Sequence, residues 1–206
     1  MGSEMCIRDR SPRVDVRRLQ LIAEEAARII AEEGVADYHA AKSKAVKRLG
    51  FPAKTKLPNN QDIEQALILR QGLFQTGQQA IAVQDLRELA LSLMRVLSEF
   101  DPHLVGPVLK GTATVYSMIQ LHLFSEDPKN VAIALLNLGI DYQAIERRQH
   151  EKNPEGYKGF AFVWHDVDVE CLIFSTNQLR VSPPSPVDGK PMRRADQVEL
   201  ERLLAS

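Results

Sequence analysis

The feature that most constrains the fold of this chain is a change in its hydrophobic period near residue 102. Before that point, apolar residues recur every three or four positions, which is the spacing of one helix face. After it, they alternate with polar residues in several short segments, as in strands with one buried face. The chain has 206 residues, which is enough to bury a core. We therefore expect an α+β protein, with a helical first part packed on a mixed sheet in the second.

The composition excludes several other classes of protein. Lys and Arg total 26 against 27 Asp and Glu, a formal net charge of −1, so a surface dedicated to coating nucleic acid is not expected. No apolar run approaches the roughly 20 residues of a membrane-spanning helix. The counts of 11 Gly, 11 Pro and 2 Cys do not fit collagen-like, low-complexity or disulfide-rich chains. We expect a cytoplasmic protein with no membrane contact.

The first ten residues, MGSEMCIRDR, resemble translated sequencing adapter. They hold no apolar stretch of the length that a signal peptide needs, and they start no periodic helix. We therefore expect residues 1–10 to be a non-native tail on a bacterial gene fragment, with a genuine disordered tail as the alternative. Cys171 is then the single native cysteine, which agrees with a reducing compartment.

Residues 11–101 are expected to form a helical region. Gly34 and Gly50 are natural stops for its first two helices, and the prolines and asparagines of 51–60 predict a loop before the third. The fourth helix is expected from about residue 79 to residue 100. Four cations gather on the second helix, where a solvated face and a binding patch are both open readings: Lys42, Lys44, Lys47 and Arg48.

Residues 102–206 are expected to form the sheet domain. Asp127 and Pro128 open a helix within it, and a final helix covers about 195–204. A proline-rich connection precedes that helix. The predicted strands are 104–111, 117–124, 142–149 and 160–174, of which the last is the longest strand signal in the chain.

Three carboxylates alternate with apolar residues in the last predicted strand. Asp166, Asp168 and Glu170 would share one face, where like charges repel unless they are solvated, paired with Arg or Lys, or neutralised by a metal. Asp166 is interpreted as facing solvent. For Asp168 and Glu170, a solvent-facing edge and a metal site are both open.

Two further segments could bind phosphate. Gly111 and Thr112 follow a predicted strand, and a turn of this kind offers backbone N–H groups and a hydroxyl to a phosphate oxygen. Arg193 and Arg194 lie just before the last helix and could clamp a phosphate at its start. A solvated basic connection is the alternative for the two arginines.

The order of these segments resembles the nucleotidyltransferase superfamily of the DNA polymerase beta type, over about residues 103–175. The segment Ser117-Met118-Ile119-Gln120-Leu121 falls where that family has Ser-Asp-Ile-Asp-Leu, and Asp168 or Glu170 matches its third acid. The resemblance implies a nucleotidyltransferase-like sheet and a nucleotide or phosphorylated small molecule as ligand. It also implies phosphate contacts from Gly111, Thr112 and Ser117, and Mg²⁺ ions held by the acids. The chain resembles most a small bacterial family with the same replaced acids.

Both acids of the first pair are replaced, by Met118 and Gln120. Met does not ligate a hard cation and Gln offers one neutral oxygen, so an ordinary two-metal site cannot be assembled. One interpretation is an altered catalytic site of Gln120, His122, Asp168 and Glu170, with one Mg²⁺ on the last two. The other is a fold without transfer chemistry that binds a protein or RNA partner. An RNA site would need the cations of 42–48 and 193–194 to share one surface.

Overall fold

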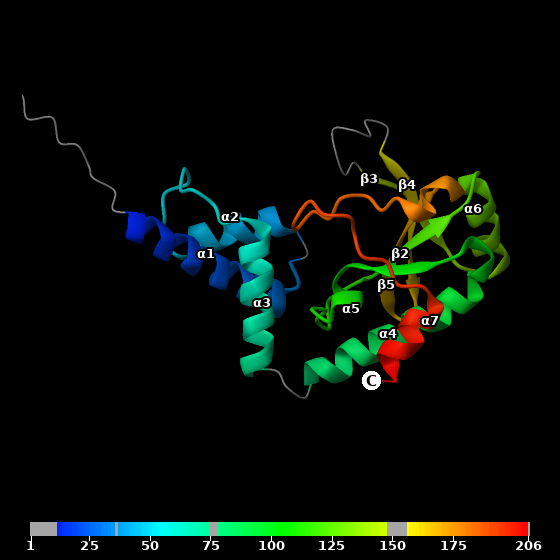
Figure 1. Ribbon diagram of the computed structural model, residues 1–206, viewed down its shortest axis with the longest axis horizontal. Coiled ribbons are helices and arrows are strands. Elements are labelled where there is room, and N and C mark those ends of the chain that lie inside the picture. Colours follow the sequence, from blue (N-terminus) through cyan, green and yellow to red (C-terminus); the bar gives the residue numbers. More distant parts are fainter. Residues whose placement is uncertain (1–11, 36, 75–77, 148–155, 206) are drawn as a thin grey trace, which may run out of the picture. The chain divides into compact units, whose positions relative to one another are not determined.

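The computed structural model describes residues 12–35, 37–74, 78–147 and 156–205. Over these residues the chain forms an α+β fold, as its sequence predicts (Figure 1). It divides into two compact units at Arg70, whereas the sequence interpretation places a boundary at residue 102. The expected tail of residues 1–10 lies outside the described residues. None of the helices within these ranges is long and apolar enough to cross a membrane.

Unit 1 spans residues 1–70, and the elements among its described residues are helices. They are α1 (Pro12–Glu33), α2 (Tyr38–Arg48) and α3 (Asn60–Phe74), whose last residues belong to unit 2. Asp37 caps α2, because its side chain accepts a hydrogen bond from the Ala40 N–H at 2.6 Å. The buried residues recur at helical spacing and form one apolar cluster, which includes Ile22, Ala26, Ile29, Ala41, Ala45, Ile63 and Leu67.

Acidic side chains of α1 bind basic side chains of α2. Glu33 forms ion pairs with Lys44 and with Arg48, the latter at 2.6 Å. The hydrogen bonds from Lys44 and Arg48 lower the pKa of Glu33 to about 2. Two of the four cations in the predicted basic cluster are therefore neutralised within this unit.

Unit 2, residues 71–206, contains one mixed sheet with the strand order β1-β2-β5-β4-β3. Strands β2 and β5 are parallel neighbours, and the other pairs are antiparallel. The strands are β1 (His103–Val105), β2 (Ile119–Phe124), β3 (Tyr142–Arg147), β4 (Tyr157–Trp164) and β5 (Val167–Phe174). The helices are α4 (Gln78–Val96), α5 (Gly106–Lys110), α6 (Pro128–Asn137) and α7 (Gln197–Leu204), with 3-10 turns η1 (Ser98–Phe100) and η2 (Thr176–Arg180).

Alternation along β2 and β5 gives this sheet two different faces. The helix-covered face carries Ile119, Leu121, Leu123, Val169, Cys171 and Ile173, which share one apolar cluster with residues of α4, α6 and α7. Figure 1 shows α4 and α7 packed next to each other at this sheet. The opposite face carries Gln120, His122 and Phe124 from β2, and Asp168, Glu170, Leu172 and Phe174 from β5.

Side-chain caps define where two helices begin, and one polar contact ties a third helix to the sheet. Asp127 caps α6 by accepting from the Lys129 N–H at 2.9 Å, and Pro128 is its first residue, as predicted. Asp196 caps α7 in the same way, through the Glu199 N–H at 2.7 Å. The Trp164 indole donates to the Ser92 hydroxyl at 3.1 Å, which ties β4 to α4.

The short strand β1 is paired on both sides. Its inner edge pairs with β2 in antiparallel register. On its outer edge, Leu104 and Ala195 exchange two backbone hydrogen bonds, of 2.8 and 3.0 Å. Ala195, in the connection before α7, therefore completes the edge of the sheet.

Two predicted strands differ from the structure. The strand predicted at 104–111 is only β1 and its continuation is the helix α5, which begins at Gly106 and has Pro107 in its first turn. The strand predicted at 160–174 is a hairpin of β4 and β5, turned by His165 and Asp166 with φ of 48° and 64°. Asp166 therefore lies in the turn and not on the face of Asp168 and Glu170.

Candidate functional site

The polar residues predicted on β2 and β5 lie on neighbouring strands of one face. Gln120 is the register partner of Glu170, and His122 is the partner of Leu172. Glu170 is buried, with 8% of its surface exposed, whereas Asp168 is exposed to solvent. The structure thus brings Gln120 and Glu170 together on the opposite face, with Asp168 two residues before Glu170.

The glycine beside this pair is Gly106, which the sequence interpretation did not select. Gly106 has a φ of +73°, and a Cβ placed on it would lie 2.1 Å from the Oε1 atom of Gln120. Only glycine adopts this backbone without strain and leaves room for the amide. The Gly-Pro pair directly after a strand was the available signal, since proline favours the first turn of a helix.

Gly111 and Thr112 lie elsewhere, at the end of α5. Gly111 is the left-handed C-cap of that helix, where the Arg87 guanidinium donates to the carbonyl oxygens of Val108 and Leu109, both at 3.1 Å. The N–H groups of Gly111 and Thr112 donate to carbonyl oxygens within the same turn. They are thus engaged in ending the helix, whereas the sequence interpretation expected them to be exposed.

Ser117 is held in a local turn with Thr114. Its hydroxyl oxygen accepts from the Thr114 N–H at 2.9 Å, and its own N–H donates to the Thr114 carbonyl at 2.9 Å. This turn leads the chain directly into β2. Its geometry positions the start of the polar strand.

Arg147 is the partner of Glu170. Its Nε donates to both carboxylate oxygens at 3.1 Å, and its Nη2 donates to Oε2 at 2.5 Å. The Glu170 side chain is 10% exposed and that of Arg147 is 53% exposed. This two-pronged pairing raises the pKa of Arg147. Residues 147 and 170 are distant in sequence, so the sequence alone gave no sign of the pair.

His122 is buried beside Arg194, a residue of the last connection. The Nε of Arg194 donates to Nδ1 of His122 at 3.0 Å, which fixes the neutral imidazole with its proton on Nε2. Burial, together with the charges of Arg194 and His103, lowers the pKa of His122 to about 3. The Nδ1 lone pair that a base would use is therefore occupied.

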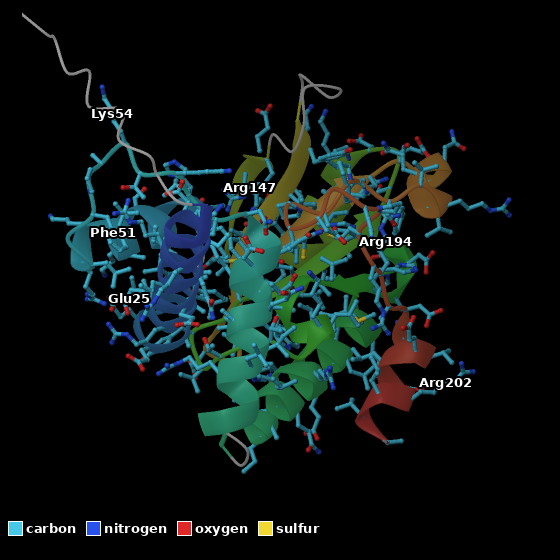
Figure 2. The ribbon with its side chains drawn as sticks, turned by 60° about the vertical axis from the view of Figure 1, so that its left-hand side comes forward. Glu25, Phe51, Lys54, Arg147, Arg194 and Arg202 are labelled. Atoms are coloured by element: carbon cyan, nitrogen blue, oxygen red, sulfur yellow. The ribbon has the colours of Figure 1, made fainter. Side chains whose placement is uncertain are left out.

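Arg194, labelled in Figure 2, makes several contacts with the opposite face. Its guanidinium carbon lies 4.9 Å from the ring centres of both Phe124 and Phe174. Its Nη1 donates to the carbonyl oxygens of Gln178 and Leu179, at 2.8 and 3.1 Å. These contacts attach the segment between β5 and α7 to the sheet.

Arg193 points to a different partner. It forms an ion pair of 2.5 Å with Glu199 of α7, and both side chains are well exposed. The two arginines predicted to clamp one phosphate thus have separate environments. The cations of 42–48 belong to unit 1 and those of 193–194 to unit 2.

The donor set does not fit a magnesium site on Asp168 and Glu170. A site of that kind needs hard oxygen ligands that are free to reach the ion, and both oxygens of Glu170 accept from Arg147. Its neighbour Gln120 is neutral and points at Gly106. Across the described ranges, no three His, Cys, Asp or Glu side chains are grouped as metal ligands would be.

Comparison with known proteins adds no family to this geometry. No protein-family model matches the chain, and no curated protein sequence matches it.

Proposed function

We propose that unit 2 is a nucleotidyltransferase-like module that binds a nucleotide or another phosphorylated ligand without transferring a group from it. The proposal is supported by the order of its segments: strand β1, helix α5 ending at Gly111, the polar-faced strand β2, helix α6 and, after β3 and β4, strand β5 with its carboxylates. It is supported also by the parallel pairing of β2 and β5, which places Gln120 beside Glu170.

We expect no group transfer because of the residue types at Met118, Gln120 and Glu170. Two-metal phosphoryl or nucleotidyl transfer needs carboxylates that hold ions against the phosphates. Met118 and Gln120 carry no charge, and Glu170 is bound by Arg147. Among the residues that the structure describes, the opposite face therefore provides no set of carboxylates that could assemble such ions.

The observation that carries the binding proposal is the Arg147 guanidinium at Glu170. A guanidinium matches the oxygens of phosphate with paired N–H donors, and it stays charged at all physiological pH values. More than half of the Arg147 side chain is exposed although its partner is buried. A phosphorylated ligand can thus reach the cation while Glu170 holds it in place. The cytoplasm, where nucleotides are made and used, is the proposed location, in agreement with the free buried thiol of Cys171.

The proposal is tested by titrating the chain with ATP, GTP, CTP, UTP and inorganic pyrophosphate in a calorimeter. We expect heat of binding with at least one of them, and no release of pyrophosphate or labelled product on longer incubation. The Met118→Asp and Gln120→Asp double variant restores the acid pair and serves as the comparison for transfer. No binding to any of these ligands would overturn the proposal and favour a module for a protein or RNA partner.

Single variants test whether a ligand binds at the opposite face. Asp168→Ala is expected to leave ligand binding unchanged or slightly tighter, because Asp168 is an exposed carboxylate beside the Glu170 pair and its charge repels a phosphate. Arg95→Met is the matched control for arginine, since Arg95 forms an exposed ion pair with Glu201 on α7. If Arg95→Met lowers ligand affinity as much as Arg147→Met does, the ligand does not bind at the opposite face.

A further inference from the structure

The Arg147 side chain reaches Glu170 across an intervening strand. Arg147 is on β3 and Glu170 is on β5, with β4 between them. Two strand spacings amount to about 10 Å, which only a long side chain meeting a second one can span. Arg147 is the last residue of β3, where it lies opposite Tyr157. The contact is therefore a diagonal one that depends on the register of three strands.

The residues of β4 leave room for this crossing. On the opposite face, the β4 positions in register with Leu172 and Glu170 are Gly159 and Ala161. A Cβ on Gly159 would lie 2.1 Å from the carbonyl oxygen of Cys171, so no larger residue fits there. The smallest side chains of the strand thus coincide with the path of the arginine.

The charge at this point is balanced within the chain. Glu170 is a buried carboxylate, and a buried charge needs a partner of opposite sign. Arg147 supplies that charge through Nε and Nη2, and Glu170 does not use its third nitrogen, Nη1. A guanidinium held in this way has one edge on the protein and another edge for a second anion.

We infer that Arg147 takes the place of a divalent cation at Glu170, so that a phosphate group binds at the opposite face without metal. This inference rests on the proposed function and adds to it how the phosphate is bound, which is by a guanidinium and not by a metal ion. The bound group is a phosphate or diphosphate that is free of its magnesium ion. Affinity then comes from a fixed guanidinium, and added magnesium competes by binding the free ligand.

The first test measures the binding of ADP and inorganic pyrophosphate in EDTA and again in excess Mg²⁺. We expect equal or tighter binding in EDTA, and a loss of about tenfold or more in Arg147→Met, as for removal of a charged hydrogen bond. Arg147→Lys keeps the charge without the paired donors, so its affinity should fall between the affinities of wild type and Arg147→Met. Binding that appears only with Mg²⁺, or that Arg147→Met leaves unchanged, would overturn the inference.

The second test uses the metal alone and needs no nucleotide. Mn²⁺ binding is followed by the electron paramagnetic resonance of the free ion. Wild type should bind no Mn²⁺ beyond the level of a double variant that combines Arg147→Met with Glu170→Gln. The single variant Arg147→Met should gain a Mn²⁺ site on Asp168 and Glu170. Equal Mn²⁺ binding by wild type and Arg147→Met would show an ordinary structural ion pair and would sink the inference.

The two tests fail in different ways. If Arg147→Met gains a manganese site and yet no phosphorylated ligand binds to wild type, the arginine does occupy the cation position, but the proposed function and the phosphate contact are both wrong. If ligands bind to wild type only with Mg²⁺, the proposed function stands and the inference is wrong. Thermal unfolding of each variant confirms that it is folded before either comparison is made.

Discussion

The two faces of the sheet in unit 2 are held by different kinds of interaction. The helix-covered face is apolar along β2 and β5, and its residues pack with those of α4, α6 and α7 in one cluster. The opposite face holds Gln120, His122 and Glu170. Arg194 binds His122 and Arg147 binds Glu170. The helix-covered face is stabilised by buried apolar area, which tolerates exchange between similar residues. The opposite face combines a smaller apolar cluster of Phe124, Leu172 and Phe174 with donors and acceptors that tolerate little change.

The difference teaches where a specific site can be built. Apolar packing is non-directional, so it fixes the sheet without fixing any one polar atom. Hydrogen bonds are directional, so Arg147 and Arg194 fix the positions of a carboxylate and an imidazole. The helix-covered face therefore supplies most of the stability, and the opposite face supplies the geometry on which our proposals rest.

The largest expected effect belongs to the helix-covered face. Leu121→Ala should lower the free energy of unfolding by about 2–5 kcal/mol, because Leu121 is fully buried and the change leaves a cavity. Urea unfolding followed by the fluorescence of Trp164, the single tryptophan, measures it. Val163→Ala, an exposed position on the opposite face, should change the same quantity by about 0.5 kcal/mol or less. Equal losses would remove the contrast between the faces.

Lowering the pH should act through His122 on the opposite face. The pKa of His122 is about 3 in the folded chain, below its ordinary 6.5, so the unfolded chain takes up the proton first. The contribution of neutral His122 is complete above pH 6.5 and is lost as the pH falls toward 3, at about 1.4 kcal/mol per pH unit. Urea unfolding across this range checks it. In His122→Gln the corresponding part of the slope should disappear, and an unchanged slope would contradict the assignment.

Removal of Arg194 should have a moderate effect. Arg194→Met should lower the free energy of unfolding by about 2 kcal/mol, because it removes the donor to buried His122 and the contacts over two phenylalanine rings. It should also raise the pKa of His122, since the Arg194 charge helps to lower it. Thermal unfolding and the NMR titration of the imidazole measure the two effects. Arg193→Met, whose ion pair is exposed, should cost about 0.5 kcal/mol or less.

The smallest expected effect compares two carboxylates of one strand. Glu170→Gln should lower the free energy of unfolding by about 1 kcal/mol, since it breaks the pair with Arg147, whose half-exposed side chain water also solvates. Asp168→Asn should leave stability unchanged, because Asp168 is exposed. Matched urea titrations of both variants measure the difference. A larger loss in Asp168→Asn would mean that the two acids act as one charged group.

Most of the fold could be predicted because it follows from periodicity and caps. The alternation of Ile119, Leu121 and Leu123 predicts β2, and Asp127 with Pro128 predicts the start of α6; both are confirmed. The hairpin of β4 and β5 was missed because its turn is His165-Asp166, without the glycine that usually marks left-handed backbone. The helix α5 was missed because five residues are too few to show a helical period.

The candidate site could be predicted only in part. The alternation predicts that Gln120 lies on the polar face of β2 and Glu170 on the polar face of β5. That these two residues are neighbours follows only from the parallel pairing of the two strands. Gly106 has a positive φ, and the Gly-Pro pair was the only local signal for this position. The arginines come from β3 and from the last connection, 23 and 72 residues away from their partners. Contacts at such separations are set by topology, which a single sequence does not display.

The pairing of Leu104 with Ala195 has a consequence for any chain that loses its last segment. Without Ala195, the backbone N–H and C=O of Leu104 would lose their partners, and without Arg194 the buried His122 would lose its donor. An unpaired strand edge is a template for pairing with another chain. Two adjacent residues, Arg194 and Ala195, therefore close the edge of the sheet and cover its polar face together.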